Sequence, residues 1–80
     1  MTARNPRQGY IAGSLAGMLQ AADPEGVRRA LLDRTTVDAV RAELADAEQR
    51  LGATPRASGV YAEHEGEVSA LREVLTLARA

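Results

Sequence analysis

The sequence predicts a small all-α domain of four helices. Along residues 36–51 and 60–79, apolar residues recur at alternating steps of three and four, which places them on one face of an α-helix. Nowhere do β-branched residues alternate with polar ones at the period of two that marks a strand. The chain has 80 residues, a length at which one hydrophobic core only just outweighs chain entropy. We therefore expect a single helical domain over residues 9–80.

The N-terminal part of the chain divides into an arm and a first helix. Residues 1–8 have no periodic apolar pattern, and Pro6 disfavours helix in the residue before it, so we expect a mobile arm there. A helix is predicted over residues 9–22. Small residues recur at every fourth position on one of its faces: Gly9, Gly13 and Gly17. Such glycines let another helix approach closely, although each weakens its own helix by up to ~1 kcal/mol relative to alanine. The apolar run is about 14 residues, short of the ~20 that span a bilayer, so no membrane segment is expected.

A second helix is predicted over residues 24–34. Asp23 suits the N-cap, Pro24 suits the first helical position, and Glu25 lies where the helix dipole favours an acid. Arg34 falls at the C-terminal end, where the dipole favours a cation. Because only a short break follows, the second and third helices should meet at an angle.

The third helix, predicted over residues 36–51, carries the clearest signals. Its apolar stripe consists of Val37, Val40, Leu44, Ala47 and Leu51. Thr35 and Asp38 have the spacing of a capping box, which satisfies free N–H groups of the first turn. Gly52 is placed to end the helix with a positive φ.

The fourth helix, predicted over residues 60–79, continues the same spacing. Its stripe consists of Tyr61, His64, Val68, Leu71, Leu75 and Ala78. A turn-rich stretch containing Pro55 and Gly59 precedes it, and two amphipathic helices joined by such a loop are typical of an antiparallel helical hairpin. Because alanine supplies much of the apolar content and Phe and Trp are absent, we expect a thin core that dimerisation completes.

Charge and cysteine content narrow the possible functions. The formal net charge of −1 argues against a general nucleic-acid binder. Without cysteine the chain has no disulfide, thiolate metal site or cysteine nucleophile, which suits the reducing cytoplasm where we expect it. Every basic side chain is arginine and alanine is abundant, a composition typical of a GC-rich genome such as that of an actinobacterium or its phage.

No residue pattern indicates catalysis. Ser14, Ser58 and Ser69 lie in no nucleophile-elbow context. Glu43 and Asp46 have the pattern of an ordinary charged helix face, with no sign of the desolvation that shifts a carboxyl pKa. We expect no enzymatic activity, no catalytic residue and no cofactor.

His64 is the only histidine, and three glutamates surround it: Glu63, Glu65 and Glu67. His64 and Glu67 are three residues apart and could reach one metal ion, but a transition-metal site needs three or four protein ligands. His64 also lies on the apolar stripe. We interpret it as a partly buried or interface histidine and expect no metal site.

Nucleic-acid binding is the alternative function. The second and third helices have the lengths of a helix-turn-helix, and four arginines lie on or near them: Arg28, Arg29, Arg34 and Arg41. Against this, Asp38 and Glu43 lie on the would-be recognition helix, where phosphates and base edges disfavour acids. The turn also lacks its usual glycine. We keep a small DNA-binding regulator as a less favoured prediction.

The favoured prediction is a non-enzymatic protein–protein interaction module. It would act as a dimer and as a small adaptor or inhibitor of the phage or mobile-element kind, docking on a larger protein that the sequence does not identify. The contact residues we expect form one patch, Tyr61, Glu63, His64, Glu65 and Glu67, followed by Arg4 and Arg7 of the arm. Tyr61 adds contact area at low entropy cost beside the charges. A structural homo-oligomer is the second alternative.

Overall fold

The computed structural model describes residues 6–79 of the chain. Within that range the structure consists of helices and connecting turns, without strands. The elements are α1 (Pro6–Gln20), α2 (Pro24–Ala30), α3 (Arg34–Ala53), α4 (Tyr61–Thr76) and the final 3-10 turn η1 (Leu77–Arg79). The prediction of an all-α protein is confirmed.

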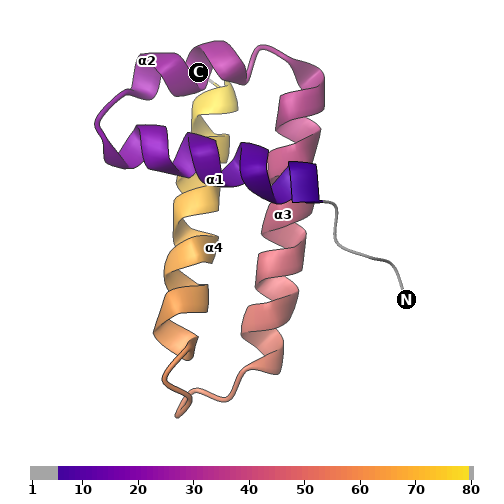
Figure 1. Ribbon diagram of the computed structural model, residues 1–80, viewed down its shortest axis with the longest axis vertical. Coiled ribbons are helices and arrows are strands. Elements are labelled where there is room, and N and C mark those ends of the chain that lie inside the picture. Colours follow the sequence, from indigo (N-terminus) through magenta and orange to yellow (C-terminus); the bar gives the residue numbers. More distant parts are fainter. Residues whose placement is uncertain (1–5, 80) are drawn as a thin grey trace.

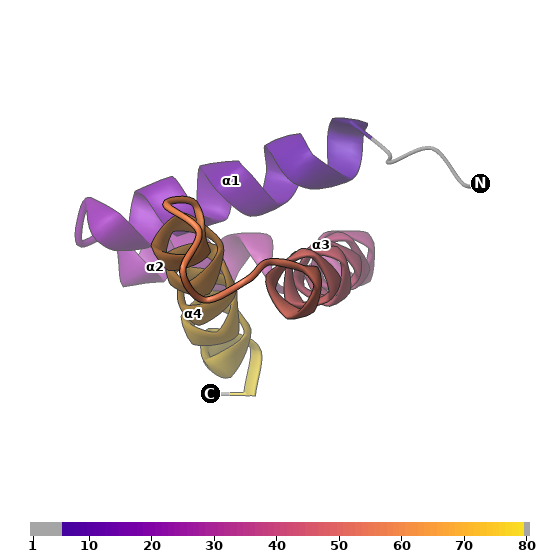
Figure 2. The same ribbon diagram turned by 90° about the horizontal axis from the view of Figure 1, so that it is seen from below.

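The helices form two layers. The two long helices, α3 and α4, lie side by side, and residues 54–60 connect them at one end of the molecule (Figure 1). Helix α1 crosses both of them on one face, so that in Figure 2 it lies above the α3–α4 layer. Helix α2 and η1 lie together at the end opposite the connecting loop (Figure 1). This arrangement buries the apolar stripes of three helices against one another.

The core is aliphatic and small. Its buried members are Ala12, Leu15, Val27, Leu31, Val40, Ala47, Val68, Leu71 and Val74. The stripe expected along the third helix lies against this core: Val40 and Ala47 are buried, and Leu44 is half-buried beside them. Because valine and alanine expose little area to bury, the hydrophobic contribution of each side chain is modest.

Helix α1 begins earlier than the sequence predicts. Its first residue is Pro6 rather than Gly9, so residues 6–8, expected in the mobile arm, are helical. Proline is compatible with this position because its fixed φ and missing N–H suit the first turn of a helix. Residues 1–5 of the expected arm, with Arg4, lie outside the described residues.

Helix α1 ends in a motif that its sequence does not predict, because glycine is absent from the final position. The N–H of Asp23 donates to the Met18 carbonyl at 2.9 Å, and that of Ala22 donates to the Leu19 carbonyl at 3.0 Å. This is the Schellman pattern, with Ala22 at a φ of 61° in the place that glycine usually takes. Asp23 then caps α2 as expected, since its Oδ1 accepts from the Gly26 N–H at 3.0 Å.

The junction between α2 and α3 differs from the prediction. Helix α2 ends at Ala30 rather than at residue 34, and α3 begins at Arg34 rather than at residue 36. The N-cap of α3 is Asp33, whose Oδ1 accepts from the Thr35 N–H at 3.0 Å, so the expected Thr35 capping box is wrong. An aspartate carboxylate is a strong N-cap acceptor, and capping by Asp33 moves Arg34 from the end of one helix to the start of the next.

The C-terminal end of α3 also differs from the prediction. The helix continues through Gly52 to Ala53 and ends at Thr54, which has an extended backbone, so the expected glycine terminus is wrong. Thr54 precedes Pro55, and the residue before a proline is disfavoured in the α region. Helix α4 then runs from Tyr61 to Thr76, and η1 carries the turn onward to residue 79, close to the predicted range of 60–79.

Candidate interaction surfaces

After Arg7, the side of α1 that faces away from the core is uncharged. We call its exposed residues the α1 outer face: Tyr10, Gly13, Ser14, Gly17 and Met18. Tyr10 is 77% exposed and Met18 39% exposed. Charged residues make up 26% of the whole chain, yet none occurs between residues 8 and 20. An exposed helix face of this composition is typical of a contact surface rather than of a solvated one.

Gly13 and Gly17 of α1 have no packing role among the described residues. A Cβ placed on Gly13 or Gly17 would meet no atom within 4 Å. These two members of the small-residue series therefore do not serve a close helix neighbour within the described part of the chain.

An open groove continues this face toward α4. Its volume is about 600 Å³, and its walls are Gly13, Ala16, Gly17, Leu19 and Gln20 of α1 with Gly66, Ser69, Ala70 and Glu73 of α4. Most of these side chains are small. The floor between the two helices is consequently accessible to the side chains of a third helix laid along it.

A polar cluster joins α1, α3 and α4. Glu43 of α3 is only 3% exposed, and its Oε1 accepts from the Gln8 side-chain amide at 3.0 Å. Gln8 also donates to Asp46 Oδ2 at 2.9 Å. Arg50 Nη2 donates to Glu67 Oε1 at 2.6 Å and lies 3.5 Å from Glu43 Oε2. Within the described residues, no buried side-chain nitrogen or oxygen is left without a partner, as burial of polar groups requires.

The burial of Glu43 corrects its interpretation as an ordinary surface carboxylate. The signal was present in the spacing, because Glu43 lies three residues after Val40 and four before Ala47, both of which are buried. Glu43 therefore lies at a core position of the helical repeat. Its charge led to the interpretation of this residue as a surface carboxylate.

The patch expected around His64 is divided in the structure. Glu63 and Glu65 are exposed on the first turns of α4, whereas Tyr61 and His64 are half-buried. Glu67 is directed into the polar cluster by its ion pair with Arg50. The Arg56 guanidinium carbon lies 6.0 Å from the centre of the Tyr61 ring, near the limit of a cation–π contact. The exposed acidic part of the patch is thus Glu63 and Glu65.

The second part of the expected site is only partly described. Arg7 is exposed at the start of α1, and Arg4 lies outside the described residues. Helix α1 begins beside the middle of α3, whereas α4 begins at the end of the molecule that carries the connecting loop (Figure 1). Arg7 therefore does not extend the surface formed by Glu63 and Glu65.

The arginines of the DNA-binding alternative lie at the α2 end of the molecule. Arg28 is paired with Glu25 at 2.5 Å. The other three, Arg29, Arg34 and Arg41, are exposed and form no ion pair with another described residue. Asp33 and Asp38 are exposed among them, so the local positive charge is small.

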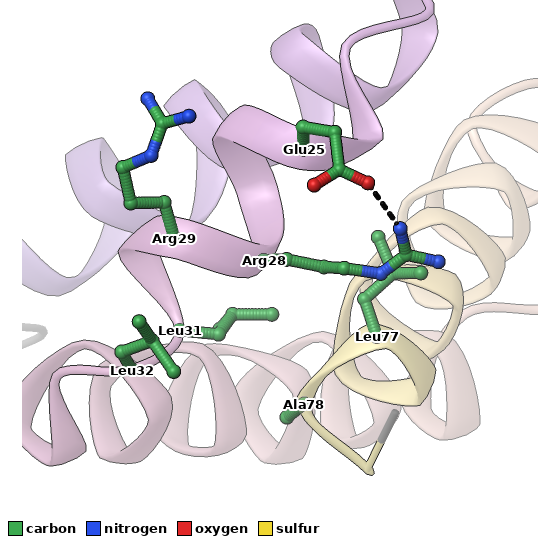
Figure 3. A pocket seen from close by; sticks show the side chains of 7 residues that line it. All are labelled: Glu25, Arg28, Arg29, Leu31, Leu32, Leu77 and Ala78. Carbon is green, nitrogen blue, oxygen red and sulfur yellow. Dashed lines mark hydrogen bonds and ion pairs between the residues drawn. The ribbon is translucent and has the colours of Figure 1, made fainter.

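A shallow pocket lined by both apolar and charged side chains lies between α2 and η1 (Figure 3). We call it the α2–η1 pocket: Glu25, Arg28, Arg29, Leu31, Leu32, Leu77 and Ala78 line a volume of about 320 Å³. Leu32 is 85% exposed, the most exposed large apolar side chain among the described residues. No local pattern in the sequence predicts this pocket, because it forms only when the C-terminal turn meets α2. Leu32 could have been noticed as a leucine outside the apolar stripe.

Neither a metal site nor a membrane-spanning helix is found among the described residues. Among residues 6–79, no group of three or more His, Asp or Glu side chains is arranged to hold a metal ion. In the same part of the chain, no helix is both long and apolar enough to cross a bilayer.

The surfaces of the molecule are the basis on which its function is inferred. Comparison of the chain with protein families, with curated proteins and with solved structures finds no match.

Proposed function

We propose that this protein is a non-enzymatic protein-interaction module whose α1 outer face packs against a helix of a larger partner protein. The observation that carries the proposal is the exposure of an uncharged helix face that holds two glycines and a tyrosine. In this proposal α3 and α4 act as an antiparallel hairpin that supports α1 and leaves its outer face free. A small adaptor or inhibitor acts in this way.

The glycines support this proposal energetically. A glycine inside a helix is about 1 kcal/mol less favourable than alanine, and Gly13 and Gly17 gain no compensating contact within the chain. Close approach of another helix is a physical reason to keep both, because a missing Cβ lets two backbones come nearer together. Tyr10 would then supply an anchor with a large contact area at one end of the contact.

The groove toward α4 supports the same orientation of the partner. Its small walls, which include Gly66 and Ala70, leave room for side chains of a docked helix between α1 and α4. Glu73 at one end offers that helix a charge with which to fix its register.

The proposal is tested with a double variant, Gly13→Gln with Gly17→Gln. Glutamine favours helix and remains solvated, so the free energy of unfolding of the isolated protein should rise by about 0.5–1 kcal/mol per site. The same side chains would hold a partner helix away, and affinity should fall at least about tenfold, or 1.4 kcal/mol. Unfolding is followed in urea by circular dichroism, and affinity by calorimetric titration.

The partner for this titration comes from a tagged pull-down of the full chain from an actinobacterial lysate treated with nuclease. Gly52→Gln on α3 is the matched control, because that glycine also has open space around it. It should leave affinity unchanged. Undiminished affinity of the double variant would remove the α1 outer face from the proposal.

DNA binding remains the second candidate because Arg29, Arg34 and Arg41 are exposed and form no ion pair with other described residues. It predicts that captured proteins are lost on nuclease treatment, and that the purified chain binds a labelled duplex with a steep dependence on salt. Either result would favour DNA binding over the interaction module.

A further inference from the structure

We propose that copies of this protein also associate head to tail, with the first turn of α4 of one copy docked in the α2–η1 pocket of the next. This contact uses neither the α1 outer face nor its groove. It is therefore independent of the function proposed above.

The receiving surface combines exposed apolar area with positive charge. Leu31, Leu32 and Leu77 form its apolar part, and Leu32 projects almost entirely into solvent. Arg28 and Arg29 extend on either side (Figure 3). Arg28 is partly neutralised by Glu25, whereas Arg29 forms no ion pair with another described residue. The chemistry that fits such a surface is an apolar side chain next to carboxylates.

The first turn of α4 presents that chemistry. Val60, the residue that precedes the helix, is 45% exposed and makes no side-chain capping bond. Glu63 and Glu65 follow within five residues, are exposed, and form no ion pair with another described residue. Being two residues apart on a helix, Glu63 and Glu65 project from opposite sides of this part of α4. A valine flanked by two exposed carboxylates is complementary, in both polarity and charge, to a leucine flanked by two guanidinium groups, of which Glu25 neutralises one in part.

The two surfaces lie at opposite ends of the molecule. The α2–η1 pocket is at the end that carries α2, and α4 begins at the other end beside the connecting loop (Figure 1). The longest dimension of the molecule is 37 Å, so one copy cannot close the contact on itself. Because the two surfaces differ, the contact is heterologous, and each added copy leaves one pocket and one acidic turn unoccupied. The assembly therefore grows with concentration instead of stopping at a dimer.

The size of the surfaces places this contact among weak associations. One pocket of about 320 Å³ with a few charges around it supplies only part of the contact area that a stable complex buries. Assembly is accordingly expected at high protein concentration and low salt, and it should decline as salt screens the ion pairs.

The test measures weight-average mass against concentration by analytical ultracentrifugation of the full chain. The wild type should show a mass that keeps rising with concentration. Arg28→Glu with Arg29→Glu, and separately Glu63→Arg with Glu65→Arg, should each lower the association constant about tenfold. A chain carrying all four substitutions has its charges exchanged and should regain association.

Two further variants keep the test independent of folding. Leu32→Ser removes the apolar anchor at a site exposed enough to leave stability unchanged, and it should also weaken association. Arg41→Glu changes an exposed arginine outside the pocket and should have no effect. A wild-type mass that stays at the monomer value would overturn the proposal. It would also be overturned by a dimer that tolerates these changes and is lost with Gly13→Gln and Gly17→Gln, since the α1 outer face would then join the copies.

Discussion

Ala22 adopts the left-handed conformation at the end of α1. Its φ of 61° is the only positive value for a non-glycine residue among those described. A Cβ is crowded in this conformation, which glycine adopts without penalty. The strain is tolerated because the turn satisfies two carbonyl groups of α1 and places Asp23 to cap α2. One residue therefore ends one helix and positions the cap of the next.

Replacing Ala22 with glycine should stabilise the protein. The variant Ala22→Gly removes the crowding at positive φ, and we expect the free energy of unfolding to rise by about 0.5–1 kcal/mol after the larger entropy of the unfolded chain is counted. Urea unfolding measures the change. Ala21→Gly, one residue earlier, is the control and should destabilise. A loss of stability in Ala22→Gly would contradict the assignment of strain to this residue.

At the scale of elements, the caps decide where helices begin. Gly26 donates its N–H to the Asp23 carboxylate, and a Cβ on residue 26 would collide with that same carboxylate. Gly66, inside α4, has no atom within 4 Å of a Cβ position. The two glycines lie in helices, yet only at Gly26 would an added Cβ displace a neighbouring side chain.

Alanine at these two positions should therefore have opposite effects. Gly66→Ala should raise the free energy of unfolding by about 0.5–1 kcal/mol, since alanine restricts the unfolded chain and favours helix. Gly26→Ala gains the same helix propensity but displaces the Asp23 cap, which is worth about 1 kcal/mol, so it should be neutral or destabilising. Thermal and urea unfolding of the two variants, compared side by side, give the answer. Equal stabilisation by both would mean that the cap moves aside without loss.

At the scale of the whole molecule, Glu43 links three helices. Its carboxylate contacts Gln8 of α1 directly and shares Arg50 with Glu67 of α4. A buried carboxylate contributes to stability only while its hydrogen bonds are complete. Its removal takes one acceptor from Gln8 and one from Arg50, which among the described residues keep only Asp46 and Glu67 respectively, and it empties the buried position between the three helices. The cluster thus favours one position of α1 across the α3–α4 layer.

The variant Glu43→Ala should lower the free energy of unfolding by about 2 kcal/mol, or Tm by about 10 °C in a domain of this size. Glu43→Gln keeps one acceptor and should lose less. Glu48→Ala is the matched control, because that glutamate forms an exposed ion pair with Arg72 and should change stability by under about 1 kcal/mol. Differential scanning calorimetry compares the three. A loss in Glu43→Ala no greater than in the control would show that the cluster does not hold α1 in place.

The sequence by itself determined the helical class, the Asp23 cap of α2 and the apolar stripe through Val40 and Ala47. These features depend on spacing and on side-chain chemistry within a few residues, which local sequence contains. Helix ends were predicted less well, because several residues compete for each cap: Asp33 replaced Thr35, and Pro55 rather than Gly52 ended α3.

Only the tertiary structure decided which surfaces remain uncovered. Gly13 and Gly17 of α1 could have packed inside the chain, and instead α1 crosses α3 and α4 (Figure 2) with both glycines exposed. Glu43 became buried and Glu67 paired with Arg50 because three helices meet there. The α2–η1 pocket exists because the last turn of the chain returns to α2. These outcomes depend on contacts between segments far apart in the sequence, which spacing along one helix does not encode.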